Sequence, residues 1–252
     1  MKKQRLDLVL VERGLAETRS KAQSLIMARR VTVNGAYVDK AGAGVGGDDA
    51  VVVVALEHPW VGRGGMKLAH ALAQFGIDVR GKVCADIGAS TGGFTDVMLK
   101  SGAARVYAID VGYGQLDVSL RNDPRVVNRE KVNARYLEAT DFEQPIEFVS
   151  IDVSFISLTL ILPAVAKFLR GELVALIKPQ FEVGKADVGK GGIVRDEEKR
   201  AAAVDAVARF AGQSFDVRGV IESPVKGAEG NVEYLMHAAT GTPATPPSTT
   251  PA

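Results

Sequence analysis

The chain has 252 residues, 46% of them hydrophobic and 24% charged, and its formal net charge is +1. This composition predicts a globular protein with room for one large domain, or for one ordinary and one small domain. The chain has no run of the roughly 18–20 apolar residues that a membrane-spanning helix requires, and its single cysteine, Cys84, excludes an intrachain disulfide. The apolar run near the N-terminus is too short for a secretory signal, so we expect a cytoplasmic protein.

The basic residues are not spread evenly along the chain. Residues 1–40 hold nine basic and four acidic side chains, a net charge of +5, whereas the remainder has a net charge of −4. A basic N-terminal segment on a mildly acidic body is typical of a module that faces a polyanion.

The N-terminal segment has the pattern of a small α+β domain. Apolar residues at helical spacing from Leu6 predict a helix that ends at Gly14, and a second helix is expected to begin near Thr18 or Ser20. The stretch "RRVTVNGAYV" predicts a β-hairpin, because Asn-Gly between β-branched residues favours a tight turn, and "DAVVVVAL" predicts a further strand. We assign residues 1–56 to this domain and residues 57–65, "EHPWVGRGG", to a linker.

After the linker the chain alternates between strand and helix patterns. Seven stretches predict strands, and helical patterns such as "GGFTDVMLKSG" separate most of the earlier ones, which predicts a doubly wound parallel α/β sheet. The last two strands, "FDVRGVIES" and "VEYLMHAA", are joined by a loop too short for a helix and should pair antiparallel. We expect this domain over residues 66–239 and a disordered Pro/Thr-rich tail over residues 240–252.

The stretch "DIGASTGGF" follows the first of these strands and opens a helix. Gly88, Gly92 and Gly93 let the backbone approach a ligand at the helix N-terminus. Asp110 closes the next strand, where an acidic residue hydrogen-bonds a ribose diol. The loop has neither the glycine spacing of a dinucleotide fingerprint nor the lysine of a phosphate loop. S-adenosylmethionine, an adenosine ligand without a pyrophosphate, therefore fits better than NAD, and a plain strand-to-helix turn is the alternative.

Two charged residues end neighbouring strand patterns. Asp152 follows "FVSI", and Lys178 follows the apolar run Leu173–Ile177 and precedes Pro179. If crossovers place these strands side by side, the two side chains leave backbones roughly 5 Å apart at the edge where open α/β sheets bind ligands. A carboxylate partner explains how a buried lysine is tolerated. A structural ion pair is the alternative, but the position at the ligand edge favours a chemical role.

Two further charged residues stand in glycine-rich contexts, where each by itself is most often a solvated surface charge. Lys67 lies in "VGRGGMKL" and Glu233 lies in "EGNVEYL". The three histidines show no spacing typical of metal ligands, so we expect no metal site.

Taken together, these stretches resemble a known family. "RLDLVLVERGLAETRSKAQSLIMARRVTVNG" resembles the small RNA-binding module named after a small-subunit ribosomal protein, the S-four domain. Six further stretches resemble the TlyA family, whose members join that module to an FtsJ-like methyltransferase domain. These stretches are "VGRGGMKL", "DIGASTGGFTDVML", "DVGYGQLDVSLRNDPRV", "IDVSFISL", "IKPQFEVGK" and "GNVEYL". The resemblance spans about residues 5–237 and implies a seven-stranded class I (Rossmann-like) methyltransferase sheet with an antiparallel last strand, behind a small α+β RNA-binding domain.

The resemblance also implies an activity, which is 2′-O-methylation of cytidine ribose in ribosomal RNA with S-adenosylmethionine as cofactor. It supplies a Lys-Asp-Lys-Glu tetrad, whose members here are Lys67, Asp152, Lys178 and Glu233. Lys178 would orient the ribose hydroxyl and accept or steer its proton, Lys67 would stabilise the developing alkoxide, and Glu233 would anchor Lys67 or the hydroxyl. The sequence leaves open which lysine is the base.

Motif positions extend the expected site beyond the tetrad. The residues expected to bind the cofactor are Asp86, Gly88, Ala89, Ser90, Thr91, Gly92, Gly93, Asp110 and Asn133. The residues expected to contact phosphates of ribosomal RNA are Arg5, Arg19, Lys21, Arg29, Arg30, Arg63, Lys185 and Lys190. Such contacts position an RNA, while sequence choice would come from its shape and from a base displaced for access.

The resemblance leaves a choice of substrate and three rival functions. Family members modify either the large-subunit rRNA alone or both subunits, and the short N-terminus and Pro/Thr-rich tail lean toward the narrower specificity. An RNA-binding scaffold with an inactive methyltransferase fold is disfavoured because all four tetrad residues are present. A membrane-active haemolysin, a label that family members carry, would need an amphipathic or spanning segment, whereas "SLTLILPAVAKFL" contains Pro163 and is predicted to be a core crossover helix. For a small-molecule methyltransferase, the basic N-terminal module would be superfluous.

Overall fold

The computed structural model describes residues 3–27, 30–54, 58–184, 187–227 and 230–241. It divides into two compact units, Met1–Gly62 and Arg63–Ala252, and each unit has a hydrophobic core of its own. The division falls inside the predicted linker. Most of the expected tail, residues 242–252, lies outside the described residues.

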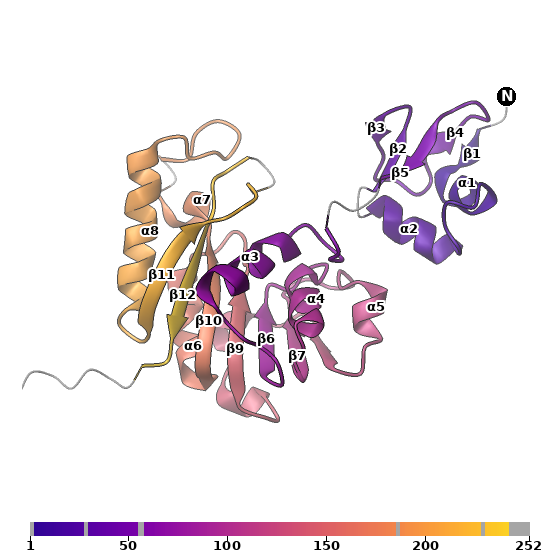
Figure 1. Cartoon of the computed structure of the whole chain (residues 1–252). Coiled ribbons are helices and arrows are strands. Elements are labelled where there is room, and N and C mark those ends of the chain that lie inside the picture. The colour runs from indigo at the N-terminus through magenta and orange to yellow at the C-terminus, as the bar shows by residue number, and fades with distance from the viewer. Residues whose placement is uncertain (1–2, 28–29, 55–57, 185–186, 228–229, 242–252) are drawn as a thin grey trace, which may run out of the picture. The chain divides into compact units, whose positions relative to one another are not determined.

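The first unit is a small α+β domain (Figure 1). Its elements are β1 (Gln4–Arg5), α1 (Leu6–Glu12), α2 (Arg19–Met27), β2 (Val31–Val33), β3 (Ala36–Tyr37), β4 (Gly44–Val45) and β5 (Val51–Val53). Asn34 and Gly35 have φ values of 52° and 81°, as a tight turn between β2 and β3 requires, so the predicted hairpin is confirmed. The pairing of β1 with β4 was not predicted, because two-residue strands show no periodicity.

The second unit is built on a seven-stranded sheet of order β11-β12-β10-β9-β6-β7-β8 (Figure 1). Its elements are α3 (Gly65–Phe75), β6 (Val83–Ile87), α4 (Gly93–Lys100), β7 (Arg105–Ile109), α5 (Val118–Arg121), β8 (Val126–Arg129), β9 (Ile146–Ile151), η3 (Leu158–Leu160), α6 (Leu162–Phe168), β10 (Leu169–Ile177), α7 (Pro179–Glu182), α8 (Glu197–Ala211), β11 (Asp216–Glu222) and β12 (Tyr234–Ala239). β8, β7, β6, β9 and β10 pair in parallel, and β12 runs antiparallel to both β10 and β11. The predicted class I sheet with its antiparallel last strand is therefore confirmed.

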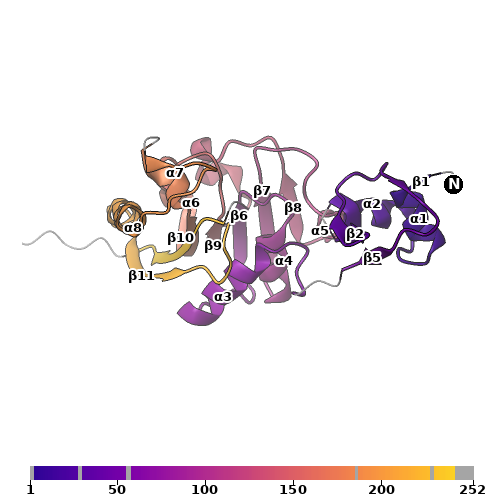
Figure 2. The same cartoon turned by 90° about the horizontal axis from the view of Figure 1, so that it is seen from above.

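Alternation along the strands assigns a face of the sheet to each side chain. Ala85 and Ile87 of β6 belong to the core that α6 and α8 cover, whereas Asp86 points to the other face, where α4 packs. Figure 2 shows α3 and α4 on one side of the sheet and α6 on the opposite side. The carboxyl ends of the parallel strands are thereby left open between the two helical layers.

The apolar stretch "SLTLILPAVAKFL" forms η3 and α6. Leu158, Leu162, Val165 and Phe168 are each at most 3% exposed and belong to the main core of the second unit. The segment is a crossover helix beneath the sheet, as the sequence predicted.

Candidate active site

Two cavities lie side by side at the carboxyl edge of the parallel strands. One has a volume of about 520 Å³ and contains Lys67, Asp152, Lys178 and Glu233 in its wall. The other, of about 420 Å³, contains Asp110 and Asn133. The two cavities share the wall residues Gly88, Ser90, Asp152, Ser154 and Phe155. A ligand in one cavity is therefore a neighbour of a ligand in the other.

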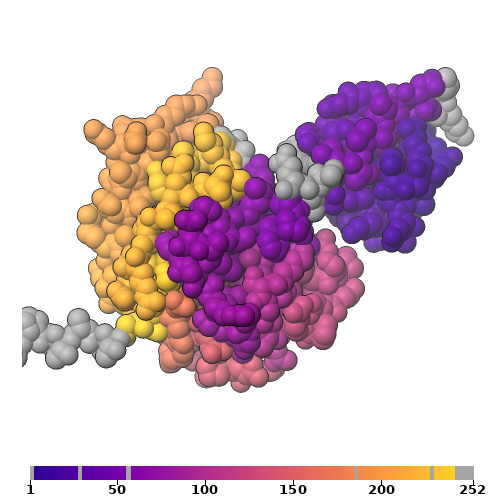
Figure 3. All heavy atoms as spheres, in the orientation of Figure 1, coloured from indigo at the N-terminus to yellow at the C-terminus, as the bar shows by residue number. Residues whose placement is uncertain are grey.

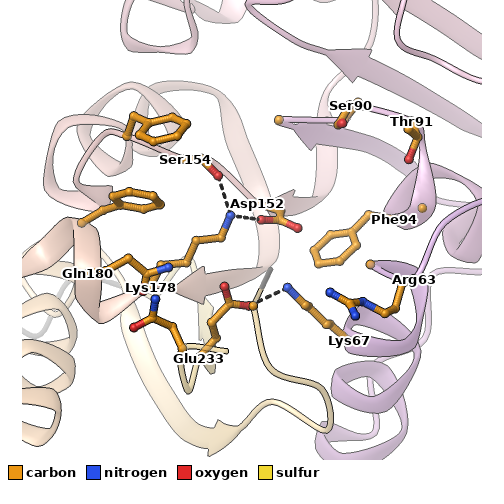
Figure 4. Close-up of a pocket in the computed structure, with 18 of the residues that line it drawn as sticks. Arg63, Lys67, Ser90, Thr91, Phe94, Asp152, Ser154, Lys178, Gln180 and Glu233 are labelled. Carbon is orange, nitrogen blue, oxygen red and sulfur yellow. Dashed lines mark hydrogen bonds and ion pairs between the residues drawn. The ribbon is translucent and has the colours of Figure 1, made fainter. Parts of the chain in front are cut away.

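Lys178 and Asp152 form an ion pair at this shared wall (Figure 4). β9 and β10 pair in parallel with Ala175 opposite Ile151, so the residues that follow the two strands emerge next to each other, as predicted. The Lys178 ammonium group lies 2.6 Å from Asp152 Oδ1 and donates to Ser154 Oγ at 2.8 Å. The Lys178 side chain is 11% exposed, which leaves it close to a ligand but shielded from bulk water.

Lys67 and Glu233 form the second ion pair in the larger cavity (Figure 4). Lys67 lies in the first turn of α3 and Glu233 just before β12, and Figure 3 shows α3 beside the yellow segment that includes β12. Lys67 Nζ donates to Glu233 Oε2 at 2.5 Å, and the two side chains are 10% and 3% exposed. The expected anchoring of Lys67 by Glu233 is present in this geometry. The four residues thus meet as two ion pairs that face one cavity.

The loop after β6 approaches the end of β9 more closely than any side chain would allow. A Cβ on Gly88, whose φ is +83°, would lie 2.3 Å from the carbonyl oxygen of Asp152. In the same loop, the backbone N–H of Ser90 donates to Asp110 Oδ2 at 2.8 Å, and that of Gly112 donates to Asp110 Oδ1 at 2.6 Å. These bonds fix the Asp110 carboxylate in the smaller cavity while each oxygen keeps a further acceptor site.

The smaller cavity suits an adenosine group. Its polar residues include Asp110 and Asn133, at the ends of β7 and β8, and its apolar walls include Ile109, Val132, Ile156 and Ile161. A carboxylate binds the ribose diol of an adenosine group, and apolar walls hold its adenine base. The smaller cavity offers both of the features that the cofactor requires.

Two predicted cofactor residues lie in neither cavity wall. Asp86 is completely buried under the loop, where Thr95 and Ser150 donate to its carboxylate at 2.6 and 2.9 Å. Burial raises the pKa of Asp86 to about 6, and the Asp152 carboxylate acts in the same direction. Gly92, with φ +96°, is needed for packing, because a Cβ there would lie 2.2 Å from Leu120 Cδ1. These residues support the loop from beneath.

The arginines predicted to contact RNA in the first unit share a buried anchor. Arg5 donates to both carboxylate oxygens of Asp7 at 3.0 Å, and Arg19 and Gln23 donate to Oδ2 at 3.0 and 2.9 Å. Asp7 is 0% exposed, whereas the Arg5 and Arg19 side chains are 50% and 55% exposed. The guanidinium group of Arg5 holds the pKa of Asp7 well below its usual range.

The other predicted RNA contacts fall into four groups. Arg63 is in the wall of the larger cavity, and Lys21 and Lys190 are exposed. Arg30 donates to the carbonyl oxygen of Val54 at 3.2 Å. Arg29 and Lys185 lie outside the described residues.

Phe155 and Asn231 are among the residues of the larger cavity that sequence reasoning missed. Phe155 is 90% exposed, has a left-handed φ of 64°, and its ring centroid lies 5.0 Å from that of Phe181. Asn231 is 2% exposed and stands in the same wall as Glu233. The available signal was that both residues lie inside stretches that carry the family resemblance, "IDVSFISL" and "GNVEYL".

The sheet order with its antiparallel last strand, and a cavity at the carboxyl edge that holds Asp110 in its wall, are features of a class I methyltransferase, the class whose cofactor is S-adenosylmethionine. The chain belongs to the FtsJ-like methyltransferase family, whose family model matches residues 60–240, and within it to the TlyA proteins; an S4 domain matches residues 4–51. The resemblance found in the sequence is thus confirmed.

Three known proteins illustrate this membership. A protein of Mycobacterium tuberculosis named 16S/23S rRNA (cytidine-2′-O)-methyltransferase TlyA is 48% identical over 94% of this chain and 90% of its own length. A 23S rRNA (cytidine-2′-O)-methyltransferase TlyA of Campylobacter jejuni is 35% identical over 75% of this chain and 74% of its own. A solved structure from Streptococcus thermophilus, named as a haemolysin, is 46% identical, with a TM-score of 0.75 over 96% of this chain and 90% of that chain.

Proposed function

We propose that the protein methylates the 2′-hydroxyl of a cytidine ribose in ribosomal RNA, with S-adenosylmethionine as methyl donor. The observation that carries this proposal is the meeting of two Lys–carboxylate pairs in one cavity beside the smaller cavity that contains Asp110. Both TlyA relatives described above are named for 23S rRNA, and one is also named for 16S rRNA. We therefore take 23S rRNA as the substrate and 16S rRNA as the second arm of the test. An rRNA substrate favours a cytoplasmic location.

Lys178 is the group that we assign to the reacting hydroxyl. When bound, S-adenosylmethionine supplies an electrophilic methyl group. Asp152 is in the wall of both cavities, so its partner Lys178 stands at their junction, where the 2′-hydroxyl must meet that methyl group. Asp152 and Ser154 fix the position of Lys178 Nζ, which we assign to orient the hydroxyl group and to accept its proton as the methyl group is transferred.

Lys67 is assigned to charge stabilisation. Its ammonium group is held by Glu233 in the same cavity, with little exposure to water. A fixed cation in a poorly hydrated site stabilises the negative charge that develops on the ribose oxygen. Alignment of the hydroxyl with the methyl group contributes up to about 7–11 kcal/mol in intramolecular models of such reactions.

Phe155 is suited to hold the displaced base. Its exposed ring stands in the wall of both cavities, and its left-handed backbone directs an aromatic group to a position that a regular strand end would not give. Unpaired bases stack on such rings. Of the predicted phosphate contacts, Arg63 in the wall of the larger cavity then positions the RNA at this site.

The proposal is tested with tritiated S-adenosylmethionine and unmodified large and small ribosomal subunits, for the wild type and Lys178→Ala. Base-resistant label on ribose of the large subunit, absent with the variant, is the expected result. Label on the small subunit as well would assign the dual specificity. No label on either subunit, with the cofactor still bound, would overturn the proposal in favour of an RNA-binding scaffold.

A membrane-lytic function is the second candidate, because a related structure is named as a haemolysin. In the part of the chain that the structure describes, none of the helices has the length and apolar character to cross a membrane. We expect no leakage from dye-loaded liposomes at protein concentrations that give full methylation, and leakage would favour the lytic function.

A further inference from the structure

Asn231 joins two segments that contribute to the larger cavity. Its side chain bonds the loop of residues 189–194, called here the 189–194 loop: Nδ2 donates to the carbonyl oxygen of Gly192 at 2.8 Å, and Oδ1 accepts from the N–H of Val194 at 3.0 Å. The Asn231 side chain thus bonds the carbonyl group of one residue and the N–H group two residues later, which is the pair that a neighbouring strand would bind. A backbone carbonyl oxygen can only accept a hydrogen bond and a backbone N–H can only donate one. The side-chain amide of Asn231 therefore satisfies both partners in one orientation only.

The 189–194 loop is held at one end and exposed at the other. Val194 is 2% exposed, whereas Lys190, Gly191 and Gly192 are exposed, and both glycines have left-handed φ values of 81° and 74°. Lys190 is one of the predicted phosphate contacts. Gly192 also stands in the wall of the larger cavity, so the loop reaches from the solvent to the site.

On its other side, Asn231 is tied to the position of Glu233. Alternate residues of an extended chain face the same side, and Asn231 and Glu233 are both in the cavity wall. The N–H of Gly227 donates to the Asn231 carbonyl oxygen at 2.9 Å, and a Cβ on Gly227 would lie 2.4 Å from Glu233 Oε1. A shift at residue 231 therefore moves the carboxylate that holds Lys67. Asp152 and Lys178 follow β9 and β10 and are not part of this linkage.

We infer that Asn231 is a positioning residue that couples the 189–194 loop to the Lys67–Glu233 pair, so that RNA engaged by the loop sets the alignment of Lys67. The inference rests on the proposed function and adds to it a residue and a direction of coupling. The amide acts through backbone groups and through Glu233.

The test compares Asn231→Ala with Ser223→Ala. Ser223 lies in the same 223–233 segment and is 9% exposed, and its hydroxyl bonds only locally, to the Val225 carbonyl oxygen at 2.8 Å. For Asn231→Ala we expect kcat on ribosomal subunits to fall roughly 10- to 100-fold, because small misplacements of reacting groups have effects of this size. The Kd for S-adenosylmethionine should stay within about twofold, and Ser223→Ala should keep wild-type kcat.

A second variant separates positioning from loss of structure. In Asn231→Asp the ionised carboxyl group accepts from Val194 but cannot donate to Gly192, whereas the protonated group can do both. The described charged residues that stand around it in the cavity wall are three cations, Arg63, Lys67 and Lys178, and two carboxylates, Asp152 and Glu233, which favours the ionised form. The kcat of Asn231→Asp should therefore fall between those of the wild type and Asn231→Ala, because one of the two hydrogen bonds is kept.

Three outcomes would overturn the inference: a wild-type kcat for Asn231→Ala, a change confined to KM, or equal losses in Asn231→Ala and Ser223→Ala. A wild-type protein that labels neither subunit would instead overturn the proposed function.

Discussion

The ammonium group of Lys178 lies 2.6 Å from Asp152 Oδ1 because β9 and β10 are parallel neighbours that end at the same edge of the sheet. Pro179 follows at once as the first residue of α7, so the chain turns away and leaves the lysine at the cavity. β10 is followed by a lysine because the end of this strand forms part of the cavity wall.

Exchange of Lys178 for arginine tests its role as the base. Lys178→Arg keeps a positive charge beside Asp152, but a guanidinium group does not give up its proton. We expect the methylation rate to fall about 10²–10⁴-fold, the usual contribution of general acid–base catalysis, with the cofactor Kd unchanged. Lys82→Arg, at an ion pair with Glu172 away from the cavities, is the control. A nearly active Lys178→Arg would show that only the charge matters.

Removal of the Asp110 charge tests the cofactor cavity. Hydrogen bonds to charged groups contribute about 1.5–3 kcal/mol, so Asp110→Asn should raise the Kd for S-adenosylmethionine roughly 10- to 150-fold. Asp117→Asn is the matched control, because Asp117 caps α5 in the adjoining loop and is not in the cavity wall. Calorimetric titration measures both, and equal affinities would remove Asp110 from the cofactor site.

Gly88→Ala should disturb both stability and activity. A left-handed alanine has an unfavourable energy of roughly 1–2 kcal/mol, and overpacking adds about 1–3 kcal/mol. Gly81→Ala isolates the backbone effect, since φ there is +72° and a Cβ would have nothing within 4 Å. Urea unfolding should show the larger loss for Gly88→Ala, which alone should lose methylation because Asp152 shifts. Equal losses of stability would contradict the close contact.

Asp86 gives the second unit a distinct dependence on pH. The pKa of Asp86 in the folded state is about 6, above the ordinary carboxyl value, so the folded state binds a proton at Asp86 more tightly than the unfolded state does. This proton stabilises the folded state, and the stabilisation is lost as the pH rises from about 4 to 6. The change is roughly 1–3 kcal/mol in the free energy of unfolding. Asp86→Asn should remove this part of the pH profile, as measured by urea unfolding at several pH values. Superimposable profiles would place the ionisation elsewhere.

Asp7→Asn tests the anchor of Arg5 and Arg19. The depressed pKa of Asp7 means that its stabilising effect is present above the ordinary carboxyl pKa and is lost as the pH falls below it. At neutral pH the variant gains positive charge, yet we expect weaker binding to 23S rRNA, by about 1–2 kcal/mol, because the guanidinium groups lose their fixed positions. Asp48→Asn makes the same charge change at an exposed position. Binding that is tighter in both variants would show that net charge alone governs RNA affinity.

Local chemistry was sufficient for the elements and for part of the site. The Asn34-Gly35 turn was predictable because few residue pairs adopt two left-handed conformations, and the seven strands were predictable from their apolar runs. The pair of Asp152 and Lys178 followed from the rule that successive parallel strands end at one edge.

Other features depend on segments that are distant in the chain. Asp86 seemed to be a cofactor residue because it begins the glycine-rich motif, but strand alternation and the donors Thr95 and Ser150 direct it beneath the loop. Phe155 and Asn231 lie inside two of the motif stretches, but no periodicity or residue spacing indicated a role for either. Their positions result from a left-handed residue at the cavity and from two hydrogen bonds to another loop.

The sequence by itself determined the order of the elements and the family, and it singled out Lys67, Asp152, Lys178 and Glu233, because propensities, turns and motifs are local properties of a chain. Only the tertiary structure decided that these four residues form two ion pairs, that Asp86 is buried, and that Asn231 holds two loops together. These features are contacts between groups far apart in the chain, which acquire a distance and a degree of burial only when the sheet is assembled.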